Sequence, residues 1–170
     1  VPMGKPITVL FLCTHNSARS ILAEALLNHL GAGKFVGYSA GSTPRESGQP
    51  NPLALHTLAE AGIPTVGLRS KSWDEFLGPA APPIDLVITV CGNANEVCPV
   101  FPGGPATAHW GYDDPSAGEW PDEIKMVAFR TTLHQIKRRL EAFTSLPAAS
   151  LEKMALEQSA RALASPHTAP

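Results

Sequence analysis

The chain has 170 residues, 44% of them hydrophobic, and a formal net charge of −2 at pH 7. This length and apolar content suffice for one compact domain with a buried core. The near-neutral charge offers no basic surface for nucleic acid, and no apolar run reaches the roughly 18 residues of a membrane span. The first residues lack the apolar segment of a secretory signal, and three cysteines do not make a secreted disulfide framework. We therefore expect a soluble, cytoplasmic protein.

The strongest local signal is an apolar strand, predicted at 8–12, followed by a loop and an amphipathic helix, predicted at 20–30. Backbone N–H groups at the mouth of a helix bind tetrahedral anions, and an arginine adds a two-pronged contact to the oxygens. This nucleophile loop, residues 13–19, is therefore a candidate oxyanion site. Its positive environment favours the thiolate of Cys13 as a nucleophile. The alternative is that Cys13 is a small buried apolar residue. The candidate oxyanion-binding residues are Thr14, His15, Asn16, Ser17, Ala18 and Arg19.

Strand and helix candidates alternate along the rest of the chain. Further strands are predicted at 35–39, 66–69 (weak), 84–90 and 107–110. Helices are predicted at 52–61 with Asn51 as N-cap, at 72–76 for one or two turns, at 122–143 and at 150–163. This alternation is typical of a parallel sheet covered on both faces. We expect a flavodoxin-like α/β fold with a central four- or five-stranded parallel sheet, in a single domain over 1–147 with a helical extension over 148–170.

Two further cysteines follow the strand predicted at 84–90. Cys91 comes directly after it and Cys98 lies seven residues later, a spacing that does not fit a zinc site. Because ligands bind at the carboxyl ends of parallel strands, Cys13 and Cys91 should converge. Three thiols suit a disulfide relay, in which one thiol forms an adduct, a second attacks it and a third resolves the second. The alternative is that Cys91 only ends a buried strand and Cys98 is incidental.

The acid loop, residues 111–115, follows the last predicted strand and contains two adjacent aspartates before Pro115. An aspartate in this loop could lie close to the nucleophile loop and protonate a leaving oxygen. Asp114 is the better candidate of the pair, because Pro115 fixes the backbone next to it. The alternative is an ordinary Asp-Pro turn.

Other conspicuous side chains are expected to have ordinary roles. His109 and Trp110 are predicted to pack beneath the acid loop, and His15 to be a solvated loop histidine. Trp120 is expected at a rim, and the basic run 137–139 on the solvated face of the long helix.

The chain contains three segments in the order CTHNSARS, VCGNANEVCPVFPG and HWGYDDP. Together they resemble those of arsenate reductases in the low-molecular-weight protein tyrosine phosphatase superfamily, over roughly 8–143. The resemblance implies a flavodoxin-like domain that reduces arsenate to arsenite for detoxification. The implied catalytic residues are Cys13 as nucleophile, Arg19 on the oxyanion, Ser20 supporting the thiolate, Asp114 as proton donor, and Cys91 and Cys98 as shuttling thiols.

The resemblance and the residues imply the same reaction. Cys13 attacks arsenate, Cys91 attacks Cys13 and releases arsenite, and Cys98 then attacks Cys91. No cofactor is expected to be bound. The expected partners are an external thiol reductant, either thioredoxin or glutathione with glutaredoxin, and arsenate itself, with phosphate or sulfate as analogues.

In the thioredoxin-coupled reductases of Gram-positive bacteria, a potassium ion supports the nucleophile loop. Asn16, Glu24 and Ser39 match three of its ligands, but Trp73 stands where the acidic ligand is expected, or that ligand is shifted to Asp74. We therefore predict no required metal. The run 68–73 and the carboxy-terminal extension resemble proteobacterial members, for which the glutaredoxin route is also open.

Two other functions are considered. A low-molecular-weight tyrosine phosphatase shares the nucleophile loop and the acid, but usually has tyrosines where this chain has Ser116 and Ala117. Weak hydrolysis of small aryl phosphates is expected in either case, since phosphate and arsenate share charge and shape. The second alternative is a catalytically silent phosphate-binding module on the same fold.

Overall fold

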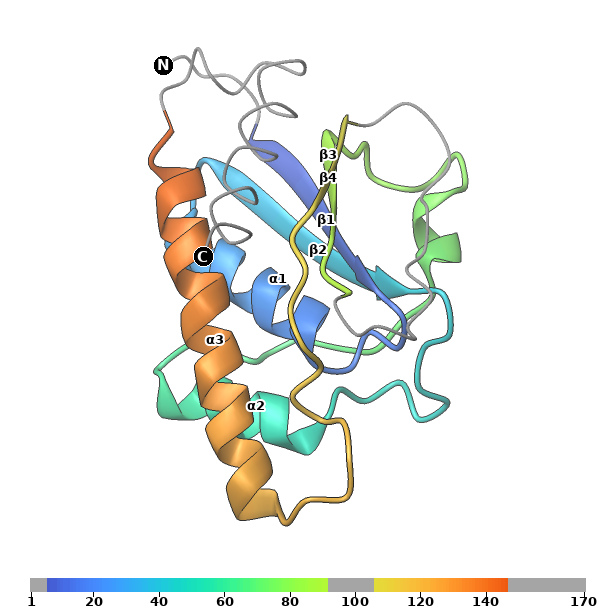
Figure 1. Cartoon of the computed structure of the whole chain (residues 1–170). Helices are drawn as coiled ribbons and strands as arrows, with labels where there is room; N and C mark the ends of the chain where they lie inside the picture. The colour runs from blue at the N-terminus through green and yellow to red at the C-terminus, as the bar shows by residue number, and fades with distance from the viewer. Residues whose placement is uncertain (1–5, 92–105, 147–170) are drawn as a thin grey trace.

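The computed structural model describes residues 6–91 and 106–146 (Figure 1). Its elements in chain order are β1 (Ile7–Cys13), α1 (Arg19–Leu30), β2 (Phe35–Gly41), α2 (Pro52–Glu60), the 3-10 helix η1 (Trp73–Phe76), β3 (Leu86–Thr89), β4 (Ala106–His109) and α3 (Asp122–Thr144). The described strands form one parallel sheet in the order β2-β1-β3-β4. The chain moves from β1 to one side and later returns to the other, so the strand order reverses beside β1. The predicted flavodoxin-like α/β fold is confirmed.

Strand β1 is buried because both faces of the sheet are covered. Alternate side chains enter two apolar clusters, since successive residues of a strand point to opposite faces. Val9 and Phe11 join a large cluster with residues of α1, α2 and α3. Leu10 and Leu12 join a smaller cluster that contains Phe76 of η1. Figure 1 shows the three long helices on one side of the sheet and η1 on the other.

Helix α2 begins and ends as its sequence predicts. The Asn51 side chain accepts a hydrogen bond from the Leu53 N–H at 2.9 Å, and Pro52 needs no partner at the first helical position. Gly62 follows with φ of 75°, a left-handed conformation that ends the helix and suits glycine.

The strand predicted at 66–69 is wrong. The Leu68 N–H donates to the Thr65 carbonyl at 3.3 Å and Gly67 has φ of 83°, so the chain turns there instead of extending. Val66 is 96% exposed, so its β-propensity finds no apolar partner to hold the segment in the sheet. The helix predicted at 150–163 lies outside the described residues.

Helix α3 buries one of the three basic residues that were expected on its solvated face. The guanidinium of Arg139 lies 5.0 Å from the ring centre of Tyr112 and 5.5 Å from that of Trp110. Such cation–π contacts compensate part of the cost of burying the charge. Burial lowers the pKa of Arg139 and raises the pKa of Tyr112 to about 12, so the phenol is neutral. Arg139 therefore anchors the segment that leads into the acid loop.

Two aromatic residues lie as predicted, and one histidine does not. Trp110 is fully buried and meets Phe143 edge-on, with ring centres 5.7 Å apart. Trp120 is 62% exposed at the surface. His109 is exposed rather than packed beneath the loop, with Nδ1 lying 2.6 Å from the Thr89 hydroxyl. Within the described ranges, no helix has the length and apolarity needed to cross a membrane.

Candidate active site

The candidate nucleophile lies at the carboxyl end of β1. Cys13 is 2% exposed, and its Sγ accepts a hydrogen bond from the Asn16 N–H at 3.2 Å. Ser20 Oγ lies 2.9 Å from the same sulfur. Because Ser20 Oγ already accepts from Asn16 Nδ2 at 2.8 Å, its own hydrogen remains to donate to Cys13. Both contacts are thus directed at the sulfur, and this arrangement holds Cys13 in place as the candidate nucleophile.

The loop after Cys13 is shaped to receive an anion. Asn16 has φ of 50°, a left-handed conformation that asparagine tolerates better than most residues and that helps successive N–H groups to converge. Helix α1 follows at once, with Ala18 as N-cap, no side-chain cap and no acidic residue in its first turn. The positive end of the helix dipole thus faces the loop without a competing carboxylate of its own first turn. His15, also in the loop, is exposed, with Nδ1 3.1 Å from the Thr43 carbonyl oxygen.

Arg19 connects this loop to the acid loop. Its Nη1 donates to the Tyr112 carbonyl oxygen at 3.1 Å, and its Nη2 lies 4.0 Å from Asp114 Oδ2. The other oxygen of Asp114 accepts from the backbone N–H of Ser116 at 2.9 Å and from its hydroxyl at 2.6 Å. The neighbouring Asp113 is exposed. The structure therefore brings Asp114 to the nucleophile loop, with one oxygen held in place and the other facing the arginine.

The second candidate thiol lies at the end of the adjacent strand. The Val90 N–H donates to the Leu12 carbonyl at 2.9 Å, and the register of β1 with β3 places Cys13 level with Val90. Cys91 is the next residue, is buried, and belongs to the same apolar cluster as Cys13. Cys98 lies outside the described residues.

Several residues that hold the nucleophile loop had not been singled out from the sequence. Ser70 donates through Oγ to the His15 carbonyl at 2.9 Å, and the Lys71 N–H donates to Asn16 Oδ1 at the same distance. Both contacts join residues 55 positions apart, so no local spacing marks them. The backbone of Gly41 packs directly beneath the loop: a Cβ there would lie 2.6 Å from the Thr14 carbonyl oxygen and 2.9 Å from the Asn16 nitrogen.

This close approach makes Gly41→Ala a test of the loop's packing. We expect the free energy of unfolding to fall by about 1–3 kcal/mol, because backbone atoms rather than a flexible side chain must move. Urea denaturation measures the change. The matched control is Gly78→Ala, since Gly78 has open space where its Cβ would lie. Equal stability of the two variants would contradict the packing argument.

The three predicted potassium ligands lie around a lysine. Ser39 Oγ donates to Glu24 Oε1, and Lys71 Nζ lies 3.6 Å from the same oxygen. Burial raises the pKa of Glu24 and lowers that of Lys71, while their mutual attraction opposes both shifts. Asn16 Oδ1 is already engaged by the Lys71 N–H. These residues do not fit a bound potassium ion, because the ammonium takes the position beside the carboxylate. Among the described residues, no three His, Cys, Asp or Glu side chains form a metal-binding group.

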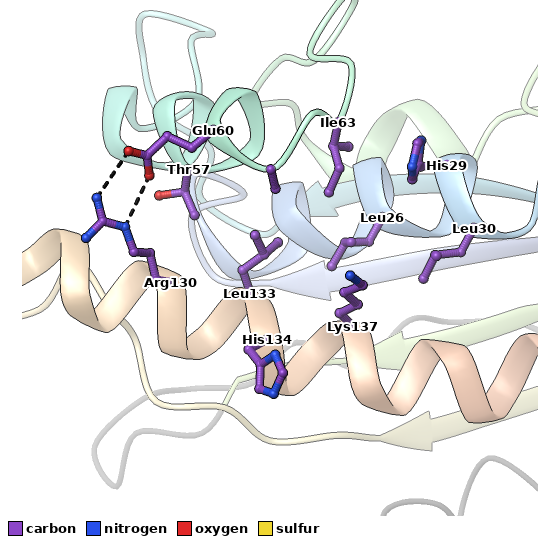
Figure 2. A pocket seen from close by; sticks show the side chains of 11 residues that line it. Leu26, His29, Leu30, Thr57, Glu60, Ile63, Arg130, Leu133, His134 and Lys137 are labelled. Atoms are coloured by element: carbon purple, nitrogen blue, oxygen red, sulfur yellow. Dashed lines mark hydrogen bonds and ion pairs between the residues drawn. The ribbon is translucent and has the colours of Figure 1, made fainter.

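A separate cavity of about 370 Å³ lies between α1, α2 and α3 (Figure 2). Leu26, Ile63 and Leu133 contribute apolar lining, and at one end Arg130 donates to both oxygens of Glu60 at 3.1 Å. No residue of the nucleophile loop or the acid loop lines it, so it is not part of the candidate active site.

The chain is similar to known proteins over most of its length. The arsenate reductase of Halalkalibacterium halodurans is 38% identical over 141 residues, which is 83% of this chain and 96% of that protein. The crystal structure of arsenate reductase from Archaeoglobus fulgidus has a TM-score of 0.66 at 28% identity, covering 81% of this chain and 99% of the other. A thioredoxin-dependent arsenate reductase from Corynebacterium glutamicum has a TM-score of 0.54 at 27% identity, covering 83% and 65%.

The match to a family extends over most of the chain. Residues 8–157 match the family described as low molecular weight phosphotyrosine protein phosphatase, a range that contains the nucleophile loop, the second cysteine and the acid loop. The chain therefore belongs to the low molecular weight phosphotyrosine protein phosphatase family.

Proposed function

We propose that this protein is an arsenate reductase, which converts arsenate to arsenite with electrons from its own thiols. The observation that carries the proposal is the pairing of Cys13, at the base of an oxyanion loop, with Cys91, buried in the same cluster at the end of the neighbouring strand. Phosphate ester hydrolysis needs only the first of these thiols, whereas reduction needs a second thiol to attack the adduct. The similar proteins named above are all arsenate reductases.

The first step is displacement at arsenic. Arg19 and the loop N–H groups hold the oxygens of arsenate while the Cys13 thiolate attacks the arsenic atom. An As–S bond forms and an As–O bond breaks, and Asp114 protonates the departing hydroxide so that it leaves as water. Arsenic keeps its oxidation state in this step. Phosphate and sulfate should occupy the same loop as analogues, because they share the tetrahedral shape and the charge.

The second step is the reduction. The Cys91 thiolate attacks Cys13 Sγ, a disulfide forms, and the electron pair of the As–S bond stays on arsenic, which leaves as arsenite. Cys91 directly follows Val90, whose N–H donates to the Leu12 carbonyl beside Cys13, and both cysteines belong to one apolar cluster, which supports a disulfide between them. Cys98 then attacks Cys91 Sγ, releases Cys13, and leaves a Cys91–Cys98 disulfide for the external reductant.

The proposed reductant is thioredoxin or glutathione with glutaredoxin, in the reducing cytoplasm where such thiols persist. The thioredoxin dependence of the Corynebacterium glutamicum protein supports the first route. The tyrosine phosphatase alternative has no better support among the relatives. The contact between Arg19 and Asp114 argues against a silent binding module, since a carboxyl group beside the arginine suits a proton donor to a leaving oxygen.

The experiment that tests the function is arsenate-dependent oxidation of NADPH by the purified protein. One assay contains thioredoxin and its reductase, and the other contains glutathione, glutaredoxin and glutathione reductase. We expect turnover with at least one system, and the active system identifies the donor. No turnover with either, alongside rapid hydrolysis of an aryl phosphate, would replace the proposal with a phosphatase.

The relay predicts a different result for each shuttling cysteine. Cys98→Ser should complete one reduction of arsenate per enzyme and then stop with Cys13 joined to Cys91, because the resolving thiol is missing. Cys91→Ser should release no arsenite. Quantifying arsenite per enzyme in a single-turnover experiment, with disulfide mapping by mass spectrometry, separates the two variants. Sustained turnover of Cys98→Ser with thioredoxin would contradict the relay.

A further inference from the structure

Lys71 forms a buried ion pair that lies behind the nucleophile loop. Its side chain is 7% exposed and that of Glu24 is 13% exposed. Lysine is almost never fully buried unless it is paired, and removing two charges from water costs free energy that their attraction only partly offsets. The ammonium also donates to the Arg69 carbonyl oxygen at 3.0 Å. A pair held at this cost, next to a catalytic loop, calls for a functional explanation.

The backbone of Lys71 is linked to the nucleophile through two side chains. Its N–H donates to Asn16 Oδ1, which fixes the amide so that Nδ2 faces Ser20. Ser20 then directs its hydroxyl hydrogen to the Cys13 sulfur. The Lys71 carbonyl also accepts from the Gly41 N–H at 2.9 Å, at the point where the backbone packs beneath the loop. The ammonium therefore tethers the side chain of Lys71, and the backbone of the same residue orients Asn16. Asn16 in turn orients Ser20 at the Cys13 sulfur.

We propose that Lys71 is a positioning residue for Cys13, and that its ammonium takes the place of a monovalent cation beside Glu24 and Ser39. The carboxylate of Glu24 carries one negative charge into the interior, and the ammonium balances it within the chain. The enzyme therefore needs no potassium ion at this point. In the proposed arsenate reductase, Lys71 thus holds the nucleophile loop in its reactive arrangement without a bound potassium ion.

The consequence of removing the ammonium follows from the oxygens around it. Lys71→Ala leaves the Glu24 carboxylate, the Ser39 hydroxyl and the Arg69 carbonyl facing a vacated space. Carboxylate, hydroxyl and carbonyl oxygens are hard ligands that suit alkali cations. A potassium ion or a small alkylammonium ion should therefore replace the lost charge in this variant. Lys71→Met keeps a side chain in the space without the charge, so it should not be rescued.

The test measures the rate at which iodoacetamide alkylates Cys13 at pH 7, followed by peptide mass spectrometry, in choline, potassium or methylammonium chloride of equal ionic strength. We expect the wild type to react equally in all three salts. Lys71→Ala should react about tenfold more slowly in choline, because the backbone N–H that orients Asn16 loses its tether, and should recover most of the rate in potassium or methylammonium. Lys137→Ala removes an exposed lysine from α3 and should behave like the wild type.

Three outcomes would overturn the proposal: acceleration of the wild type by potassium, a wild-type rate of Lys71→Ala in choline, or a slow rate of Lys71→Ala that neither cation restores. If Lys71→Ala fails to fold, the double variant Glu24→Gln, Lys71→Met removes both charges. It should fold, alkylate slowly and ignore potassium, and rapid alkylation would contradict the positioning role. The readout contains no arsenate, so its result does not depend on whether the protein proves to be an arsenate reductase.

Discussion

Cys13→Ser is expected to lower arsenate turnover by about 10⁴-fold or more. A serine hydroxyl is not ionised at neutral pH, and it cannot form the disulfide that releases arsenite. The nucleophile loop should keep its conformation, because Asn16 and Ser20 can still hydrogen-bond to an oxygen in place of the sulfur. NADPH oxidation measures the loss, and calorimetric titration with phosphate measures the binding that remains.

The combination of lost turnover and retained binding is the informative result. If phosphate binding disappears with the thiol, the loss of activity reports a collapsed loop and not a missing nucleophile. Turnover above about one hundredth of the wild-type value would contradict the role of Cys13.

Asp114→Asn is expected to slow the first step, adduct formation, by about 10²–10⁴-fold. Asparagine has nearly the same shape, and its amide oxygen can still accept both hydrogen bonds from Ser116. What it lacks is an acidic proton for the departing hydroxide. Single-turnover measurement of arsenite formation isolates the effect from reduction by the external thiol.

The adjacent residue provides a matched control. Asp113 is exposed, so Asp113→Asn should stay within about twofold of the wild type, the range expected for surface substitutions. Equal losses of adduct formation in Asp113→Asn and Asp114→Asn would contradict the assignment of Asp114 as the acid.

Local periodicity explains what the sequence predicts well. The nucleophile loop between β1 and α1, helix α2 with its Asn51 cap, and helix α3 all follow from patterns confined to a few turns or one strand. The exposed Val66 shows the limit of such patterns, because a β-branched residue extends only where it has something to pack against. The long-range contacts of Lys71 had no local signature at all.

Arg139 was missed for a different reason. Its spacing from Ile136 and Phe143 places it on the buried stripe of α3, so helical periodicity contained the correct answer. The basic residues at 137 and 138 led to the prediction of a solvated run. That prediction used the charge of Arg139 and not its position on the helix. Position is the stronger indicator when aromatic rings such as Tyr112 and Trp110 can accommodate a guanidinium.

The missing side-chain cap at the start of α1 also affects the protein's resistance to heat. A helix whose first N–H groups lack a cap is incomplete, and a bound oxyanion finishes it as a serine or aspartate would. Any ligand that binds only the folded state raises stability, by about 2.7 kcal/mol at a hundred times its dissociation constant. Phosphate and sulfate would then compete with arsenate and protect the enzyme from thermal unfolding in the same binding event. Inhibition and protection would share one concentration dependence.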